Sequence, residues 1–370
     1  MLQDATDVFV AGGGPAGLAV AIAARQRGLS VIVADGAEPP IDKACGEGLL
    51  PDGLVALQRL GIQLPPAETH AFSGIRFLSS RSSVEAPFPE QECGVAIRRT
   101  VLHRIMAERA EQLHARLMWR TSVNSIHADA VTLNDRVVCA RWIVGADGAN
   151  SLVRRWAGIG TASLPRLRYA FRRHYRMAPW TDHMEVHWGE RCQGYATGVS
   201  SEQVCVALAS RDPKMRLDDG LLELPLLRER LRGAEIISTD RGAATGNRKL
   251  KRVWKNNVAL VGDASGTVDA ITGEGLGLAF SQAVVLAECL RRGDLSPYQR
   301  AHRKLMLRPS VMAALMLTLD CRPWLQRRTL RVFGTYPHVF RRLLELHVGA
   351  RSPLELAVDG LTLGWGLLTA

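Results

Sequence analysis

With 370 residues, 47% of them hydrophobic, the chain is long enough to bury a large core and to form two domains. Its seven cysteines show neither paired spacing nor a metal-ligand pattern, which suits a reducing compartment and makes zinc or any other metal unexpected. The formal net charge is +11, but no nucleic-acid recognition motif accompanies it, so nucleic acid is not an expected partner.

The first predicted elements are a strand, a glycine-rich turn and a helix. Residues 7–11 are typical of a short buried strand, and residues 18–27 of an Ala-rich helix that Gly28 ends. In such a turn one glycine permits the tight bend, a second lets the backbone approach a pyrophosphate, and a third allows close helix–strand packing. The helix N-terminus offers free N–H groups to phosphate. The candidate binding residues are Gly12, Gly14, Pro15, Ala16 and Gly17.

A second apolar strand is predicted at residues 29–34, and it ends in Asp35, 18 residues after Gly17. A carboxylate at this position accepts hydrogen bonds from ribose hydroxyls. Strand, turn, helix and acid together predict a dinucleotide site that favours an unphosphorylated adenosine ribose.

Short alternating strands are predicted in two regions, residues 66–97 and residues 165–255. Such alternation indicates half-buried antiparallel strands. A helix headed by Arg99 is expected from Thr100 to Leu117. No Pro/Gly/Ser-rich linker interrupts the chain, so the two expected domains are interleaved.

Two further glycine–aspartate segments follow, Gly145–Ser151 and Gly262–Gly266, the second running on to Thr272–Gly275. An apolar strand at 258–261 precedes Gly262, and a long apolar helix at 276–290 follows Gly275. Either segment alone is compatible with a turn and an N-cap aspartate. Their presence together, in this order, disfavours that interpretation.

These three segments resemble the FAD-dependent family that contains the single-component aromatic-ring monooxygenases and the geranylgeranyl reductases, over roughly residues 5–290. The resemblance implies that Asp147 and Gly148 contact FAD and the incoming nicotinamide nucleotide. It also implies that Gly262 and Asp263 hold the ribityl and pyrophosphate portion of FAD. It also implies a helix N-terminus facing the isoalloxazine ring, at Gly273 and Gly275. Only one dinucleotide fingerprint is present, so NADH or NADPH is expected to visit transiently.

The resemblance also points to other candidate site residues. Cys45 and Gly46 match a Cys-Gly stretch that lies by the reactive face of the flavin in the geranylgeranyl reductases, so Cys45 is a candidate pocket residue. Arg99 matches a family arginine that contacts FAD, with Arg98 as its rival. Histidines in strand-like segments, such as His174, are expected to be structural.

The expected fold is therefore α/β, with a Rossmann-like FAD-binding domain, an interleaved antiparallel-sheet substrate domain and a helical C-terminal region. The FAD-binding domain is expected to take residues 1–65, 95–160 and 256–295. The substrate domain takes residues 66–94 and 161–255, and the helical basic region takes 296–370.

The C-terminal region carries most of the positive charge. Residues 291–351 hold 13 Arg and Lys against three acids, a net charge of +10, and their apolar stretches are separated by Arg pairs and by Pro309, Pro323 and Pro337. Such helices indicate attachment to an anionic membrane surface or to an acidic carrier protein, with a solvated helical cap as the third interpretation. No apolar run approaches the ~20 residues of a membrane span, and the N-terminus lacks the basic start of a signal peptide. We expect a cytoplasmic protein, peripheral to the membrane if the tail attaches.

Two flavin chemistries fit the resemblance. Reduced flavin either reacts with dioxygen to form a C4a-hydroperoxide that hydroxylates an activated ring, or passes a hydride to a polarised alkene. The stretches 45–48 and 272–275 resemble the reductases, whereas 194–199 lacks the Trp and Pro of their prenyl-pocket motif and looks more like the monooxygenases. We expect an NAD(P)H-dependent monooxygenase of an aromatic or lipophilic small molecule. The alternatives are an alkene reductase of the geranylgeranyl-reductase type and a non-enzymatic flavin-binding protein.

Overall fold

The first apolar run of the chain forms the middle of a parallel sheet. In the computed structural model, which describes residues 4–89, 92–134, 136–160 and 167–351, strand β1 (Asp4–Ala11) pairs in parallel with β2 (Val31–Ala34) and with β11 (Val137–Gly145). The sheet order is β18-β19-β11-β1-β2-β8. Its other members are β8 (Arg116–Met118), β9 (Val123–Ile126), β10 (Ala130–Leu133), β18 (Trp254–Lys255) and β19 (Val258–Leu260).

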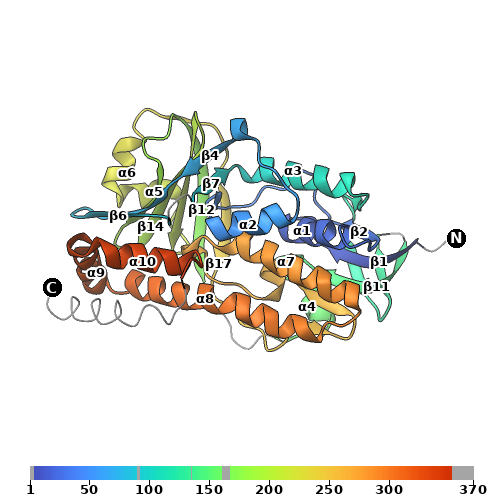
Figure 1. Ribbon diagram of the computed structural model, residues 1–370. Coiled ribbons are helices and arrows are strands. Elements are labelled where there is room, and N and C mark those ends of the chain that lie inside the picture. The colour runs from blue at the N-terminus through green and yellow to red at the C-terminus, as the bar shows by residue number, and fades with distance from the viewer. Residues whose placement is uncertain (1–3, 90–91, 135, 161–166, 352–370) are drawn as a thin grey trace.

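Both faces of this sheet are buried, which explains why β1 is continuously apolar. Val8 and Val10 point into a core shared with three helices, whereas Phe9 and Ala11 point into a second core on the other face. The three helices are α1 (Pro15–Arg25), α3 (Arg99–Gln112) and α7 (Gly275–Arg292), which lie side by side (Figure 1). The short helices α2 (Pro51–Arg59) and α4 (Leu152–Trp156) complete this part of the molecule.

A second sheet stands at the other end of the molecule (Figure 1), with the order β16-β12-β15-β14-β13-β5-β6 and with β17 on β12. All its pairs are antiparallel except β13 with β5. Its strands are β5 (Gly74–Leu78), β6 (Ser83–Pro87), β12 (Arg168–Arg176), β13 (His183–Trp188), β14 (Cys192–Ser200), β15 (Gln203–Ser210), β16 (Glu235–Ile236) and β17 (Arg241–Thr245).

Two short helices and a small sheet belong to the same end. The helices are α5 (Leu217–Leu222) and α6 (Pro225–Arg230). The three-stranded sheet joins β3 (Gly48–Leu49), β7 (Gly94–Ile97) and β4 (Thr69–Phe72). The fold is thus the expected mixed α/β arrangement, in which the chain passes between the two sheets more than once.

The C-terminal region packs three helices against the second sheet. They are α8 (Ser296–Asp320), α9 (Pro323–Thr335) and α10 (Pro337–His347), and α8 runs along the underside of both parts of the molecule (Figure 1). The ring of Phe340 stacks on Phe77 at 4.8 Å and on Phe333 at 4.7 Å between centroids, which ties α9 and α10 to β5. Within the described residues no helix is long and apolar enough to cross a bilayer.

Several expected boundaries differ from the structure. The helix expected to reach Leu117 ends at Gln112, because His114 takes a positive φ of 61° and the chain then enters β8 beside β2. Pro309 does not separate two helices but lies buried inside α8, whereas Pro323 and Pro337 each begin a helix, where a missing N–H costs nothing. The predicted domain boundaries stay a prediction, and their residues 1–3, 90–91, 135, 161–166 and 352–370 lie outside the described part.

Candidate active site

The loops that follow the parallel strands surround one large cavity. It has a volume of about 820 Å³ and lies where β1, β2, β11 and β19 end, the edge at which ligands bind in open α/β sheets. All the candidate residues except Gly17 line it: Gly12, Gly14, Pro15, Ala16, Asp35, Cys45, Gly46, Arg99, Asp147, Gly148, Gly262, Asp263, Gly273 and Gly275. The second sheet and the C-terminal helices supply the rest of its wall.

The three glycines of the first turn occupy different environments. Gly12 has a φ of +108°, and a Cβ there would lie 2.5 Å from the carbonyl oxygen of Ala146. A Cβ on Gly17 would lie 1.9 Å from the carbonyl oxygen of Gly12, so this glycine serves helix–strand packing. A Cβ on Gly14 would meet nothing within 4 Å, so this position leaves space beside the N-terminus of α1.

Asp35 organises the same turn. One carboxylate oxygen, Oδ2, accepts a 2.7 Å hydrogen bond from the N–H of Gly13, and Oδ1 accepts a 2.8 Å bond from the N–H of Ala37. Each carboxylate oxygen has a second lone pair, so ribose hydroxyls can still donate to it. The structure thus gives Asp35 a backbone role that the sequence alone did not reveal.

The two later glycine–aspartate segments are joined by a buried arginine. Arg154 donates to the carbonyl oxygen of Ala264 at 3.1 Å and to that of Ala149 at 2.9 Å. Asp147 accepts through Oδ2 from the N–H groups of Leu152 and Val153, while its Oδ1 is buried without a partner. The first turn of α4 is therefore capped by the same aspartate that lines the cavity.

Asp263 and the neighbouring arginines Arg98 and Arg99 face different surroundings. Asp263 lies 3.1 Å from the ammonium of Lys43, and both side chains are close to half exposed. Arg99 lines the cavity, and its Nε is buried without a partner. Arg98 instead points to His174, with its Nη2 3.5 Å from Nδ1. Of the two rival arginines, Arg99 is the one on the cavity wall.

These residues fit a bound FAD. The open space at Gly14 lies at a helix N-terminus, where N–H groups and the helix dipole favour a pyrophosphate. Arg99 Nε and Asp147 Oδ1 are buried polar atoms on the cavity wall that still need partners. FAD would be held at the turn of residues 12–17 and by the segments 147–148 and 262–263.

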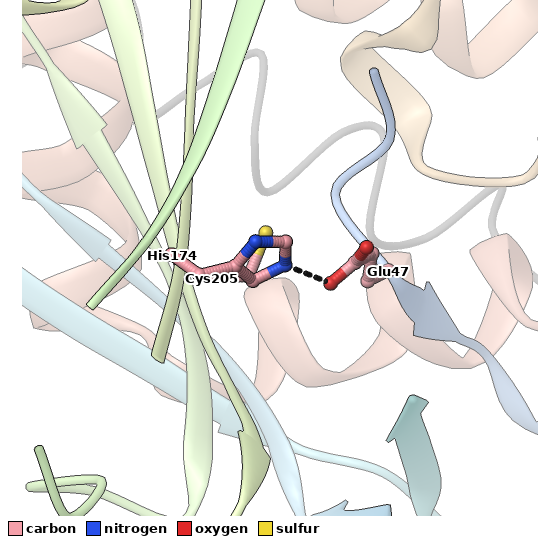
Figure 2. A group of neighbouring side chains, drawn as sticks. All are labelled: Glu47, His174 and Cys205. Atoms are coloured by element: carbon pink, nitrogen blue, oxygen red, sulfur yellow. Dashed lines mark hydrogen bonds and ion pairs between the residues drawn. The ribbon is translucent and has the colours of Figure 1, made fainter. Parts of the chain in front are cut away.

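A buried group of polar side chains at the same cavity wall was not predicted from the sequence. Oε2 of Glu47 lies 2.6 Å from Nε2 of His174, and both side chains are almost fully buried. Figure 2 shows the two side chains facing each other. Nη1 of Arg172 lies 3.1 Å from His174 Nδ1, and this arginine is ion-paired with Asp42. The one available signal was an acid between two glycines in the stretch Cys45–Gly48.

With Cys205, Glu47 and His174 place three potential ligand atoms within 4.8 Å of one another. The surroundings oppose a cation, however. The guanidinium of Arg172 is buried beside both side chains, with its Nε 4.0 Å from Glu47, and like charges repel strongly in such a site. Burial raises the pKa of the Cys205 thiol well above its ordinary value, so it stays protonated. The arrangement favours a hydrogen-bond network.

A second buried cluster fixes the C-terminal helices to the cavity. Arg308 of α8 pairs with Asp52 of α2 and lies 3.4 Å from Glu274, next to the predicted residues Gly273 and Gly275. His347 of α10 has its Nε2 3.1 Å from the carbonyl oxygen of Thr272. Burial raises the pKa of Glu274 to about 8, with the charge of Asp52 adding to the effect and Arg308 opposing it.

Comparison with known proteins agrees with this site. The family described as "FAD binding domain" matches residues 5–185. The menaquinone reductase of Mycolicibacterium smegmatis is 30% identical over 328 residues, which cover 80% of this chain and 78% of that protein. Digeranylgeranylglycerophospholipid reductase 1 of Methanothermobacter thermautotrophicus is 27% identical over 335 residues, with 80% and 82% covered.

A shorter match and a solved structure extend the comparison. The ubiquinone hydroxylase UbiL of Rhodospirillum rubrum is 32% identical over 174 residues, covering 43% of this chain and 41% of that protein. The crystal structure of a flavoprotein/dehydrogenase from Cytophaga hutchinsonii superposes with a TM-score of 0.81 at 16% identity, covering 94% of this chain and 93% of that one. At that identity the likeness shows the fold alone.

Fold, cavity and relatives define an FAD-dependent oxidoreductase. The chain belongs to the FAD-dependent family that includes the menaquinone reductases and the digeranylgeranylglycerophospholipid reductases. The relatives include both reductases and a hydroxylase, so family membership by itself leaves the reaction open.

Proposed function

We propose that this protein is a reductase that saturates a carbon–carbon double bond in the isoprenoid part of a lipophilic molecule. The observation that carries the proposal is an apolar part of the cavity wall, here called the apolar arm. It is built by the second half of α8 and by α9 and α10, and it belongs to the same cavity as the stretch Cys45–Gly48. Its wall is lined by Met312, Leu315, Met316, Leu319, Leu325, Phe333, Phe340, Leu343 and Leu344.

An apolar arm of this kind suits a chain of isoprene units, because burying such a chain gains free energy from every methylene removed from water. The two relatives that match over most of the chain are named reductases of menaquinone and of digeranylgeranylglycerophospholipid, molecules that carry long isoprenoid chains. Bound FAD would supply the hydride, and NADH or NADPH would be the external reductant. The chain's own residues position the double bond, exclude water and supply a proton.

Hydroxylation, the reaction that the sequence led us to expect first, is here the second candidate. It is favoured by the stretch Gly194–Val199, which has neither Trp nor Pro, and by the similarity to the ubiquinone hydroxylase. That reaction would need a cavity closed to water and dioxygen as a second substrate.

Product mass separates the two reactions. The holoprotein is incubated with menaquinone in detergent and NADPH or NADH, with and without dioxygen. After any quinol has been oxidised back to the quinone, the proposal expects a product heavier by two hydrogens that also forms without dioxygen. A product that gains one oxygen atom, and only in the presence of dioxygen, would establish the hydroxylase in its place.

We also propose that the protein takes its substrate from an anionic membrane surface. On α8 the side chains of Leu307, Val311 and Leu315 form a stripe with spacing of four residues, and they are 65%, 57% and 37% exposed. Leu315 also lines the cavity, so the exposed stripe leads to its apolar arm. The exposed cations Arg303 and Lys304 continue this stripe, which complements anionic headgroups.

A further inference from the structure

Glu47 is an acid that the fold keeps buried at the cavity wall. It is 2% exposed and takes a positive φ of 62°, a backbone conformation that few side chains adopt. It lies on the loop after Cys45, and its backbone N–H donates to the thiol sulfur of Cys45 at 3.3 Å. A buried carboxyl beside the cavity, on a residue whose backbone takes a costly conformation, indicates a functional role.

The contacts of His174 determine where its proton lies. Arg172 can only donate, and its Nη1 is 3.1 Å from Nδ1 of His174. The hydroxyl of Ser238 is 2.9 Å from the same nitrogen and accepts the backbone N–H of His174, and since Arg172 already makes Nδ1 an acceptor, the hydroxyl can donate to it. Nδ1 is therefore the acceptor, and Nε2 carries the hydrogen that faces Glu47 at 2.6 Å.

A hydrogen-bonded row of three residues, Glu47, His174 and Ser238, leads from the cavity to solvent. Glu47 lines the cavity, His174 is fully buried, and Ser238 is partly exposed on the segment between β16 and β17. Consecutive atoms of the row lie 2.6 Å and 2.9 Å apart, distances at which protons pass between hydrogen-bonded groups.

We propose that Glu47 is the acid that protonates the substrate, and that His174 and Ser238 resupply it with protons from solvent. The inference rests on the reductase proposed above. Saturation of a double bond adds a hydride to one carbon and a proton to the other. The reduced cofactor would supply the hydride. The proton leaves Glu47 in its protonated form, in which it is held on a lone pair that neither Arg99 nor His174 uses, and Glu47 becomes a carboxylate. Water then returns one proton through the hydroxyl of Ser238 and the imidazole of His174.

The charged groups around His174 direct this transfer. Arg172 faces Nδ1 and is paired with Asp42, which also pairs with Arg241, while Arg98 approaches Nδ1 at 3.5 Å. Both guanidinium groups can only donate, so Nδ1 accepts hydrogen bonds in the resting protein. The neighbouring thiol of Cys205 stays neutral and donates to the carbonyl oxygen of Cys45 at 3.7 Å.

A purely structural role for Glu47 makes a different prediction. Its Oε1 accepts a 2.9 Å bond from the N–H of Arg99, the first residue of α3, and its backbone carbonyl accepts from the N–H of Ile97. Glu47→Gln keeps the shape of the side chain and an oxygen for Arg99, but its N–H₂ group then faces the Nε2–H of His174, and the acid is lost. FAD content and melting temperature report a structural loss, whereas reoxidation by the substrate reports the loss of proton delivery.

The test compares Glu47→Gln with the wild-type holoprotein and with Glu185→Gln. Glu185 is a matched control, because it is equally buried and lies 3.0 Å from a histidine, His187, yet does not line the cavity. The flavin is reduced anaerobically with one equivalent of dithionite and mixed with menaquinol, whose ring is already reduced, in detergent made up in D₂O. Its reoxidation is followed optically and the product by mass.

In the wild type, deuterium from solvent is expected at the protonated carbon of each double bond reduced. In Glu47→Gln we expect the same FAD content and the same reduction by dithionite, but reoxidation by the substrate slowed on the order of 10²-fold. Glu185→Gln should match the wild type. Normal reoxidation by Glu47→Gln would overturn the inference while leaving the reductase intact, and a wild type that reduces no double bond would overturn the reductase.

A spectroscopic readout tests the row independently of activity. Nitrogen NMR of histidine-labelled protein, with His174→Asn used to assign the signals, should show Nδ1 of His174 without a proton and Nε2 with one. Glu47→Gln should shift the Nε2 resonance, whereas Glu185→Gln should not. A proton on Nδ1 in the resting protein, or a His174 signal indifferent to Glu47→Gln, would rule out the proposed relay even if the enzyme is inactive toward menaquinone.

Discussion

At the residue scale, the glycines of the first turn have different roles, one at the binding cavity and one in helix–strand packing. Gly17 allows α1 to lie against the backbone of Gly12, whereas Gly14 borders open space on the cavity wall. Both functions were predicted from the spacing alone, because glycine turns of this kind follow from backbone geometry. What spacing does not reveal is a partner far away in the sequence, such as His174 for Glu47, since the two are 127 positions apart.

Gly14→Ala and Gly17→Ala should therefore have different effects, the first on FAD binding and the second on stability. Gly14→Ala is expected to leave the melting temperature of the apoprotein unchanged but to weaken FAD binding, because the new methyl group occupies the space of the pyrophosphate. Gly17→Ala forces the helix away from the strand and should lower apoprotein stability by ~2 kcal/mol or more. Calorimetry of the apoproteins and flavin titration measure the two effects. Equal loss of stability in both variants would contradict this assignment.

Asp263 makes a second prediction at this scale. Its ion pair with Lys43 is nearly half exposed on both sides, so losing the pair should change stability by less than about 1 kcal/mol. Asp263→Ala is nevertheless expected to retain less FAD through purification than the wild type, and less than Lys43→Ala, which breaks the same pair from the other side. If Asp263→Ala retains FAD fully, Asp263 does not hold the cofactor.

At the scale of elements, strands and helices with strong apolar patterns were predictable, and β5, β13 and β15 lie where alternation placed them. The end of α3 was not predictable, because its residues up to Leu117 suit a helix and only pairing of β8 with β2 selects a strand. The buried proline of α8 was misjudged for a similar reason, since packing against neighbouring helices outweighs a lost hydrogen bond.

The docking of α8 and α10 onto the cavity predicts a pH dependence of stability. The pKa of Glu274 is about 8 in the folded protein, against an ordinary value of 4.5. Between these values the folded protein binds more protons than the unfolded chain, so stability is lost as pH rises through about 8. Burial lowers the pKa of His302 and of His347 to about 4, so these two histidines destabilise the fold only below about pH 6.5.

Glu274→Gln isolates this effect in the window from about pH 6.5 to 8.5. The melting temperature of the wild-type holoprotein, measured with excess FAD, should fall across the window, and that of Glu274→Gln should stay nearly level. A tenfold difference in proton affinity between the folded and unfolded chains corresponds to about 1.4 kcal/mol, so an effect of a few kcal/mol is expected. Parallel curves for the two proteins would show that Glu274 does not titrate in this range.

At the scale of the whole molecule, the basic C-terminal region combines two roles. Its inner faces close the apolar arm of the cavity, and its outer face carries the stripe Leu307–Val311–Leu315. The sequence indicated helices with apolar and basic sides, but it did not show that the apolar side is shared between the cavity and the surface. That division depends on the packing of α9 and α10 against β5 and β6.

Co-sedimentation with vesicles tests the outer face. The protein should sediment with vesicles rich in phosphatidylglycerol, less with pure phosphatidylcholine, and less again as salt screens the cations. Leu307→Ser combined with Val311→Ser should reduce binding at least several-fold, since each loses ~1–2 kcal/mol of apolar burial. Val55→Ser, at a 50% exposed valine on α2, is the control and should bind normally. Failure to sediment at any composition would leave an acidic protein partner or a solvated helical cap as the interpretation of the charge.

The flavin content of the purified protein is the most direct test of the site, since cavity, turns and proposed chemistry all depend on that cofactor. We predict that the protein is isolated yellow, or takes up added FAD, and that FAD released by denaturation amounts to one molecule per chain. A colourless, folded protein that binds no added FAD would contradict the assignment of the cavity and every step that depends on it.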